Sequence, residues 1–391
     1  MRIAPLPRFR LLQHSQLGED SYHSLLISLL RGLAALQVAA AHLRNEFMPS
    51  MRSIEDPALW YQGLAFATGF AHQAVVVFFL ISGWLVGGSL LNKMDQPHAL
   101  RSYAIDRISR LWTVLIPTFM LIVALGILSG AVDPRSADFA RENAYSWAAF
   151  GGNLAGLQTI AVPQFGGNYP LWSLANESWY YLMFPLLVLY MDGRRRLLCG
   201  AGMLLCAFVL PFEITLYFTI WLLGAAFSRI RLDCGAVTRV VLVLLLAALS
   251  IYFRLKGKND DLVLASFGQD LLLSLVFLPL LSSTVIRPAL AAPRIAPLRK
   301  WADWLSSFSF TLYVVHVPVL GLLRWLGQHL FGVDKLGADS ALDLLLYLAM
   351  LTIVVGFSYG FYRLFEARTG QVRRALKKML PGRVQPGLRA M

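Results

Sequence analysis

The sequence predicts an all-α integral membrane protein with about ten transmembrane helices and with both termini in the cytoplasm. Of its 391 residues, 57% are hydrophobic and only 15% are charged. A water-soluble domain of this length carries more charge and lacks long apolar runs. The apolar segments also alternate with loops in which Lys and Arg gather, which is typical of a polytopic membrane protein.

Ten apolar segments follow one another along the chain. They are 24–43, 70–91, 111–130, 174–191, 197–212, 214–228, 240–253, 262–283, 305–323 and 342–362. A helix needs about 20 apolar residues to cross a bilayer unaided, and the fifth, sixth and seventh segments are shorter than this. We therefore expect about ten spans, of which these three need support from their neighbours.

The Lys and Arg residues set the expected orientation. With the N-terminus inside, the inner segments carry 25 of them and the outer segments carry 9. This positive-inside bias explains the net charge of +13 better than nucleic-acid binding does. We expect a cytoplasmic segment 1–23, a transmembrane domain 24–366 and a basic cytoplasmic tail 367–391. The tail has basic residues at helical spacing, so it is predicted to form a cationic helix on the anionic inner leaflet.

The first span carries two polar side chains, Arg31 and His42, eleven residues apart. At about 1.5 Å of rise per residue they lie about 16 Å apart along the helix axis. Titratable groups at such depths are costly and generally functional. In one interpretation His42 is a general base that removes a hydroxyl proton during acyl transfer, because imidazole titrates near the working pH. In the other, His42 is an interfacial histidine that caps the span.

Two motifs lie at and after the end of the second span. The pair Ser82-Gly83 favours close helix packing, and a nucleophilic Ser82 is the alternative. Arg107 and Arg110 are three residues apart, hence on one helix face at the membrane entrance. Such a face suits the phosphates of a ligand, and ordinary anchoring by positive charge is the alternative.

The fourth and ninth segments add further candidates. Glu177 enters the membrane from the outer side at about the depth of His42, where it could orient His42 or bind a sugar hydroxyl. His316 is a second buried imidazole, either functional or simply packed and hydrogen bonded. Aromatic residues around Glu177 suit sugar stacking and equally an interfacial belt; they are Trp172, Trp179, Tyr180 and Tyr181.

The three cysteines, Cys199, Cys206 and Cys234, do not have the spacing of metal ligands. We expect Cys199 and Cys206 to be small packing residues, and we expect no metal site.

Taken in order, these motifs resemble the acyltransferase 3 family of bacterial integral-membrane acyltransferases. The resemblance covers about 31–366, nearly the whole chain. The matching motifs are Arg31-Gly32-Leu33-Ala34-Ala35 with His42, Phe78-Phe79-Leu80-Ile81-Ser82-Gly83, the Arg-x-x-Arg at 107–110, Leu171-Trp172-Ser173-Leu174 with Glu177, Leu312-Tyr313 with His316, and Tyr362-Arg363-Leu364-Phe365-Glu366.

The resemblance implies ten core helices and transfer of an acyl group from cytoplasmic acyl-CoA to a hydroxyl of an extracytoplasmic or lipid-linked glycan. It identifies His42 with the essential first-helix histidine and Arg31 with its partner arginine. It likewise identifies Arg107 and Arg110 with the donor-binding motif, and Glu177 with the acidic residue after Trp-Ser-Leu. No tightly bound cofactor is implied, since acyl-CoA (acetyl-CoA on family grounds) is the donor substrate.

We therefore expect an O-acetyltransferase of surface or exopolysaccharide glycans, multi-pass in the bacterial inner membrane. Its partners would be acyl-CoA, a glycan or lipid-linked oligosaccharide, and membrane lipids, but no nucleic acid. The expected site residues are His42, Glu177 and Arg31 for catalysis, Arg107, Arg110 and Arg31 for the donor, and Ser82, Trp172, Ser173 and His316 as further candidates. A small-molecule acceptor, or a glycan transporter or flippase, remains the alternative, although the chain shows no inverted repeat.

Overall fold

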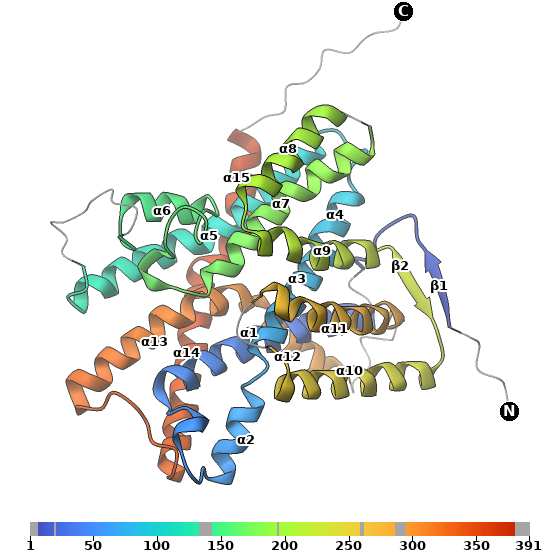
Figure 1. Ribbon diagram of the computed structural model, residues 1–391. Helices are drawn as coiled ribbons and strands as arrows, with labels where there is room; N and C mark the ends of the chain where they lie inside the picture. The colour runs from blue at the N-terminus through green and yellow to red at the C-terminus, as the bar shows by residue number, and fades with distance from the viewer. Residues whose placement is uncertain are drawn as a thin grey trace, which may run out of the picture.

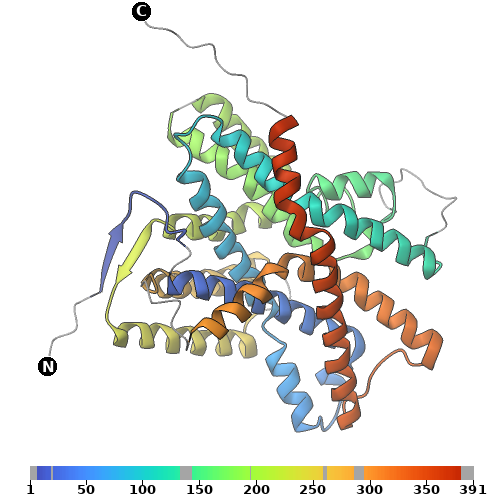
Figure 2. The same ribbon diagram turned by 180° about the vertical axis from the view of Figure 1, so that it is seen from behind.

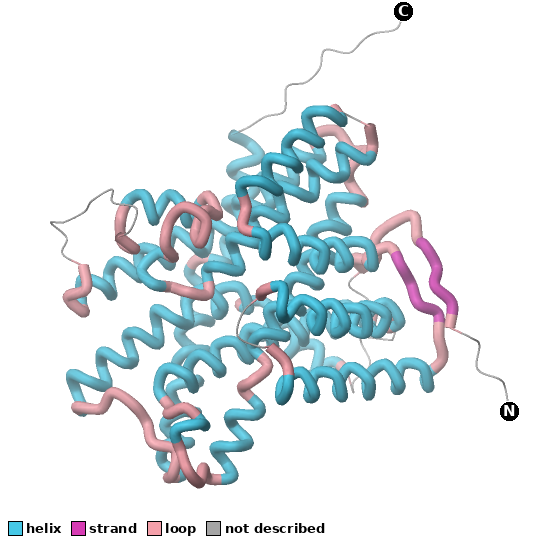
Figure 3. The backbone as a smooth tube through the Cα atoms, in the orientation of Figure 1, coloured by secondary structure: helices cyan, strands magenta, loops and turns pink. Residues whose placement is uncertain are grey.

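The computed structural model describes residues 7–18, 21–132, 143–193, 195–258, 262–285 and 295–379. Within these ranges the chain forms one bundle of helices with a pair of short strands at its edge (Figure 1, Figure 3). The α-helices are α1 (Tyr22–Phe47), α2 (Leu59–Ala67), α3 (Ala71–Ser82), α4 (Gly88–Leu91), α5 (Ala99–Leu128), α6 (Trp147–Leu154), α7 (Leu171–Met191), α8 (Arg196–Val209), α9 (Phe212–Phe227), α10 (Ala236–Lys256), α11 (Leu264–Ser283), α12 (Ala296–Ser307), α13 (Ser309–Phe331), α14 (Ala341–Leu364) and α15 (Thr369–Met379).

Every apolar segment drawn from the sequence overlaps a helix. Seven helices in the described residues are long and apolar enough to cross a membrane, and α8 and α9 are shorter apolar helices. An all-α membrane fold is thus confirmed, whereas the count of ten spans and the orientation of the termini stay predictions. The fifth and sixth segments are indeed short, because α8 and α9 have only 14 and 16 residues. The expectation for the seventh segment is wrong, because α10 has 21 residues and is long enough to cross.

The long helices alternate in direction and define two ends of the bundle. We call the end where α1, α5 and α13 begin the terminal face, and the end where they finish the loop face. At the terminal face, Arg299 of α12 donates a 3.0 Å hydrogen bond to Ser24 near the start of α1. At the loop face, Arg324 of α13 forms a 2.6 Å ion pair with Glu46 near the end of α1.

The second predicted span is a composite of three helical pieces. Between α3 and α4 lies a π-helical turn, η2 (Gly83–Gly87). A Cβ on Gly83 would lie 2.0 Å from the carbonyl oxygen of Trp221 in α9, and one on Gly224 would lie 2.2 Å from that of Leu80. The close helix packing predicted for the Ser82-Gly83 motif is therefore confirmed. Such π turns are frequent at functional sites, and η2 lines the main cavity described below.

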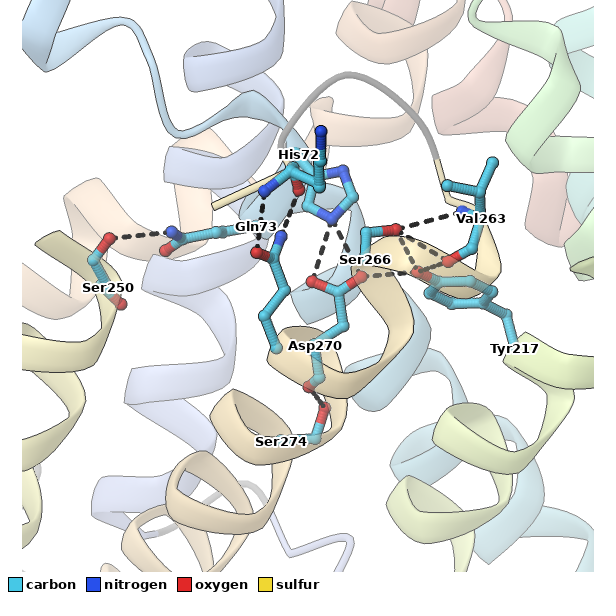
Figure 4. A network of polar contacts seen from close by, with 10 residues as sticks. His72, Gln73, Tyr217, Ser250, Val263, Ser266, Asp270 and Ser274 are labelled. Carbon is cyan, nitrogen blue, oxygen red and sulfur yellow. Dashed lines mark hydrogen bonds and ion pairs between the residues drawn. The ribbon is translucent and has the colours of Figure 1, made fainter. Parts of the chain in front are cut away.

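A buried polar network ties α3, α9 and α11 together near the loop face (Figure 4). The carboxylate of Asp270 is fully buried and accepts hydrogen bonds from His72 Nε2, at 2.9 Å to each oxygen, and from the Tyr217 hydroxyl at 2.6 Å. The same hydroxyl lies 2.9 Å from Ser266 Oγ. Because an unpaired carboxylate is costly in such surroundings, these partners make Asp270 tolerable and fix how the three helices pack.

The sequence did not predict two features at the terminal face, a pair of strands and the packing of the C-terminal helix on α5. Strand β1 (Arg8–Leu11) pairs antiparallel with β2 (Ile230–Asp233), which joins the N-terminal segment to the chain after α9. Helix α15 continues from α14 through the turn η4 (Glu366–Arg368) and lies beside α5 (Figure 2). Its Lys377 pairs with Asp106 of α5 at 2.9 Å. The tail is thus helical as predicted as far as residue 379, its inner-leaflet location stays a prediction, and residues 380–391 lie outside the described part.

Candidate active site

Two imidazoles from distant parts of the sequence form a pair. His42 Nδ1 of α1 lies 2.8 Å from His316 Nε2 of α13, and the two rings stack with centroids 5.1 Å apart. The pair forms because the alanine-rich half of α1 packs closely on α13: Ala35 and Ala39 are fully buried in one cluster with residues of α13. The sequence left open whether His316 is functional or simply packed and hydrogen bonded. The structure shows that it is fully buried and that its Nε2 lies within hydrogen-bond distance of His42, the candidate base.

The hydrogen bonds of this histidine pair fix which nitrogen of His42 is free. His316 Nδ1 lies 3.0 Å from the carbonyl oxygen of Leu312, which can only accept, so this nitrogen carries the hydrogen. In a neutral ring the other nitrogen of His316 has a lone pair and accepts from His42 Nδ1–H. The Nε2 of His42 is then an acceptor, and no partner occupies it within the described ranges. This is the arrangement that a general base needs.

The tyrosine after the long loop packs against the pair. The ring of Tyr169 meets that of His42 edge-on, with centroids 4.8 Å apart. Tyr169 is placed by its neighbour Asn168, whose side-chain amide donates to the Val314 carbonyl at 2.9 Å. That carbonyl lacks its helical partner, since Pro318 has no N–H. Burial raises the pKa of the Tyr169 hydroxyl, so it stays protonated and can donate.

A cavity of about 580 Å³ opens in the bundle on the terminal-face side of the histidine pair. We call it the charged cavity because five charged side chains from four helices line it. They are Arg31 of α1, Arg107 and Arg110 of α5, Glu177 of α7 and Asp303 of α12. Four residues that the sequence analysis assigned to one site are therefore brought together. A cavity of this size is in the range of ligand sites.

The two arginines of the Arg-x-x-Arg motif differ in their surroundings. Arg107 lies over the rings of Tyr181 and Tyr103, at 5.6 and 6.0 Å, and its buried Nε has no hydrogen-bond partner in the part of the chain described. Arg110 forms a 2.5 Å ion pair with Glu366. Of these two arginines, Arg107 is therefore the one available to an anionic ligand, while Arg110 is held by Glu366.

The sequence analysis gave Glu366 no role, yet it connects three elements. Its side chain is 1% exposed. One oxygen pairs with Arg110, and the other accepts from the backbone N–H and the hydroxyl of Thr311, at 3.1 and 2.5 Å, in the first turn of α13. A carboxylate at a helix N-terminus is favourable. The signals in the sequence were an acidic residue shortly after the last apolar segment and its place at the end of the motif Tyr362-Arg363-Leu364-Phe365-Glu366.

Glu177 lies in the charged cavity and not against His42. In the described residues, the hydrogen-bond partner of His42 is His316, so the orienting contact first considered for Glu177 is made by the second imidazole instead. Two residues that face the same cavity separate the two regions. The Ser173 and Tyr313 hydroxyls lie 2.7 Å apart, and the Tyr313 ring lies 6.1 Å from that of His316. The side chain of Tyr313 therefore lies between the charged cavity and the histidine pair.

The remaining candidates have packing contacts. Ser82 Oγ accepts from the indole N–H of Trp221 at 3.1 Å, and no histidine contacts it among the described residues. Trp172 is half-buried against the main core cluster. Of the expected aromatic rim, Tyr180 is fully buried and Tyr181 lines the charged cavity, so these two rings point into the bundle. Cys199 and Cys206 are buried, as expected for packing residues.

Comparison with known proteins adds to this geometry. A family model described as "Acyltransferase domain" matches residues 26–363. The protein "Acyltransferase MdmB" of Streptomyces mycarofaciens is 26% identical over 189 residues, which are 47% of this chain and 44% of that protein. The chain thus matches less than half the length of this relative. No solved structure is significantly similar.

Proposed function

The chain belongs to the acyltransferase 3 family, and from that premise we propose that it is a membrane-embedded O-acyltransferase. The observation that carries the proposal is the His42–His316 pair, one side chain away from a cavity that holds an unpaired arginine. The donor is acyl-CoA, with acetyl as the acyl group on family grounds. The acceptor is a hydroxyl of a surface or exopolysaccharide glycan.

The terminal face is assigned to the cytoplasm of a bacterial inner membrane. The positive-inside bias of the loops supports this orientation. The charged cavity then faces the acyl-CoA pool, and the histidine pair lies toward the outer leaflet, where a glycan acceptor is found.

Arg107 binds a phosphate of the donor in this proposal. Its free N–H groups suit a phosphate oxygen, and the rings of Tyr103 and Tyr181 hold its plane. Arg110 contributes positive charge while it stays paired with Glu366. Arg31 and Glu177 line the path that the pantetheine arm follows toward Tyr313.

The chemical step uses the free nitrogen of His42. Nε2 removes the proton of the acceptor hydroxyl as its oxygen attacks the thioester carbonyl carbon. The carbon–sulfur bond then breaks, and the departing CoA thiolate takes the proton from His42. The products are an ester and CoA. His316 holds the imidazole in the required tautomer and orientation, as the partner of a catalytic histidine does elsewhere.

The test is the O-acetyl content of surface and secreted glycans in a deletion strain. The strain is complemented with wild type or with His42→Ala, and both proteins are quantified in the membrane. We expect wild type to restore acetyl esters and the variant to lose a factor of about 10² to 10⁴ in rate.

Equal restoration by both proteins would show that His42 is structural. If no acyl ester on any glycan changes in the deletion strain, the acceptor is not a glycan. Radiolabelled acetyl-CoA supplied to proteoliposomes then separates a small-molecule acceptor from transport, because transport persists without acyl-CoA.

A further inference from the structure

A second, smaller pocket lies between the end of α5, the loop before α7 and the second half of α13. Its volume is about 190 Å³. At about 30 Å³ per water this is room for roughly six waters, or for one six-membered sugar ring. We call it the aromatic pocket because Tyr145 and Trp325 contribute rings to a wall that is otherwise mostly aliphatic and glycine.

One polar atom of a residue that lines this pocket has no hydrogen-bond partner among the described residues. Asn168 is 1% exposed, and its side-chain amide nitrogen donates to the Val314 carbonyl. Its Oδ1 is buried and has no hydrogen-bond partner anywhere in the described ranges. A buried acceptor without a donor is unusual in a native protein and calls for a ligand or water that donates to it. Because Asn168 lines the aromatic pocket, a hydroxyl held there can supply that donor.

The aromatic pocket lies directly beside the histidine pair. Asn168 precedes Tyr169, whose ring contacts His42, and the lining residue Val317 follows His316. The pocket therefore adjoins, through their chain neighbours, the two residues that contact His42, namely Tyr169 and His316. The charged cavity reaches the pair from the other side, through Tyr313.

The chemistry of the wall restricts the ligand. Thirteen residues line the pocket, and only Ser129, Tyr145, Asn168 and Trp325 have polar side-chain atoms. The Ser129 hydroxyl already donates to the Gly126 carbonyl. A fully hydroxylated hexose would leave several hydroxyls unpaired against aliphatic groups, whereas a ring with a methyl or deoxy position would leave fewer of them unpaired.

We propose that the aromatic pocket is the acceptor subsite and that it binds one deoxysugar ring of the acceptor, with a hydroxyl donating to Asn168 Oδ1. The proposal rests on the acyltransferase function proposed above. The aromatic rings stack on the apolar face of the sugar, and Gly321, whose Cβ position is open, leaves room for it.

Gly321 of α13 allows a test that spares the fold. A Cβ on Gly321 meets nothing within 4 Å, so Gly321→Leu fills the pocket without a backbone clash. Gly356 of α14 also has open space, lies away from both cavities and is the matched control as Gly356→Leu. The probes are methyl D-fucoside and methyl D-galactoside of the same anomeric configuration, which differ only in one hydroxyl, and binding to purified protein is measured by saturation-transfer NMR.

We expect wild type and Gly356→Leu to bind the fucoside about fivefold more tightly than the galactoside, the effect of one unpaired hydroxyl. Gly321→Leu should lose both signals. With acetyl-CoA and a deoxysugar-containing acceptor, Gly321→Leu should raise KM for the acceptor about tenfold and leave KM for acetyl-CoA unchanged.

Three outcomes would overturn the proposal: equal binding of both probes, unchanged probe binding in Gly321→Leu, or a change in preference for donor chain length instead of the acceptor. The last result would make the aromatic pocket an acyl-chain site. Probe binding is read without turnover, so it still decides the proposal if no acyl transfer is observed. Transfer by wild type with no effect of Gly321→Leu refutes the subsite and leaves the proposed function intact.

Discussion

Removing the second imidazole is the most direct test of how the candidate base is oriented. In His316→Leu the free nitrogen of His42 is retained, but the acceptor of its Nδ1–H is gone. The leucine fills a fully buried position that is already surrounded by apolar side chains, so we expect the fold to survive. The imidazole of His42 is then free to change tautomer or rotate.

The size of the effect follows from the lost hydrogen bond. The 2.8 Å bond between His42 and His316 lies in a part-buried site, and leaving a buried donor unpaired costs about 1–3 kcal/mol. Outer partners of catalytic or metal-bound histidines have comparable effects, about 10- to 100-fold. We therefore expect kcat to fall about 10- to 100-fold while KM for acyl-CoA is unchanged.

The assay is CoA release from acetyl-CoA by protein in proteoliposomes, with the acceptor saturating. His316→Gln is the conservative variant, because its amide oxygen can accept from His42 Nδ1–H, and it should recover most of kcat. His14 is an exposed histidine of the N-terminal segment, so His14→Leu controls for histidine removal. The double variant with His42→Ala should be no slower than His42→Ala alone, since the two residues act as one unit.

Two results would refute this reasoning. If His316→Leu keeps the wild-type kcat, the hydrogen bond does not orient the base. If kcat of the double variant falls by the product of the factors found for the two single variants, His316 acts independently of His42.

Three further predictions concern the charged cavity and the helix packing. Arg107→Ala should raise KM for acyl-CoA about tenfold in steady-state kinetics without changing the melting temperature, because its buried Nε has no hydrogen-bond partner among the described residues; an unchanged KM would contradict its proposed donor role. Arg110→Ala should lower the free energy of unfolding by about 1–3 kcal/mol in a detergent melt, since it leaves buried Glu366 without its cation; an unchanged melt would show that the pair is not structural. Gly83→Ala should also lower the melting temperature, because its Cβ would lie 2.0 Å from a carbonyl oxygen of α9, whereas Gly356→Ala should not.

The sequence was informative wherever a polar residue interrupts an apolar run. Arg31 and His42 stand out for this reason. Arg31 lines the charged cavity and His42 belongs to the histidine pair, which are the two regions of the candidate site. Asp270 gave the same kind of signal in the eighth segment and was overlooked, although it is the centre of the network in Figure 4. A carboxylate inside a predicted span is as costly as an arginine, so it is an equally strong indication of a buried polar partner.

Contacts between distant segments could not be predicted from one sequence. His42 and His316 are 274 residues apart, and periodicity within a helix says nothing about which helix faces it. For the same reason Glu177 was assigned to the depth of His42 but lies in the charged cavity. The π turn η2 was also hidden, because an apolar run reads the same whether its hydrogen bonds follow the α or the π pattern.

The composition of the histidine pair determines how far the transferred proton can travel. In a serine protease the histidine is backed by a carboxylate, which stabilises the imidazolium that forms. Here the chain of hydrogen bonds ends at the carbonyl of Leu312, which holds no charge and cannot take a proton. An imidazolium at His42 would therefore be poorly compensated in a low-dielectric site, so it cannot persist as a stable species. The proton has to pass on to the departing thiolate, which leaves both products and both histidines neutral. A base without a buried carboxylate thus suits the proposed reaction, which begins and ends without net charge at this depth of the membrane, and the charged side chains are kept in the cavity that we propose for the donor.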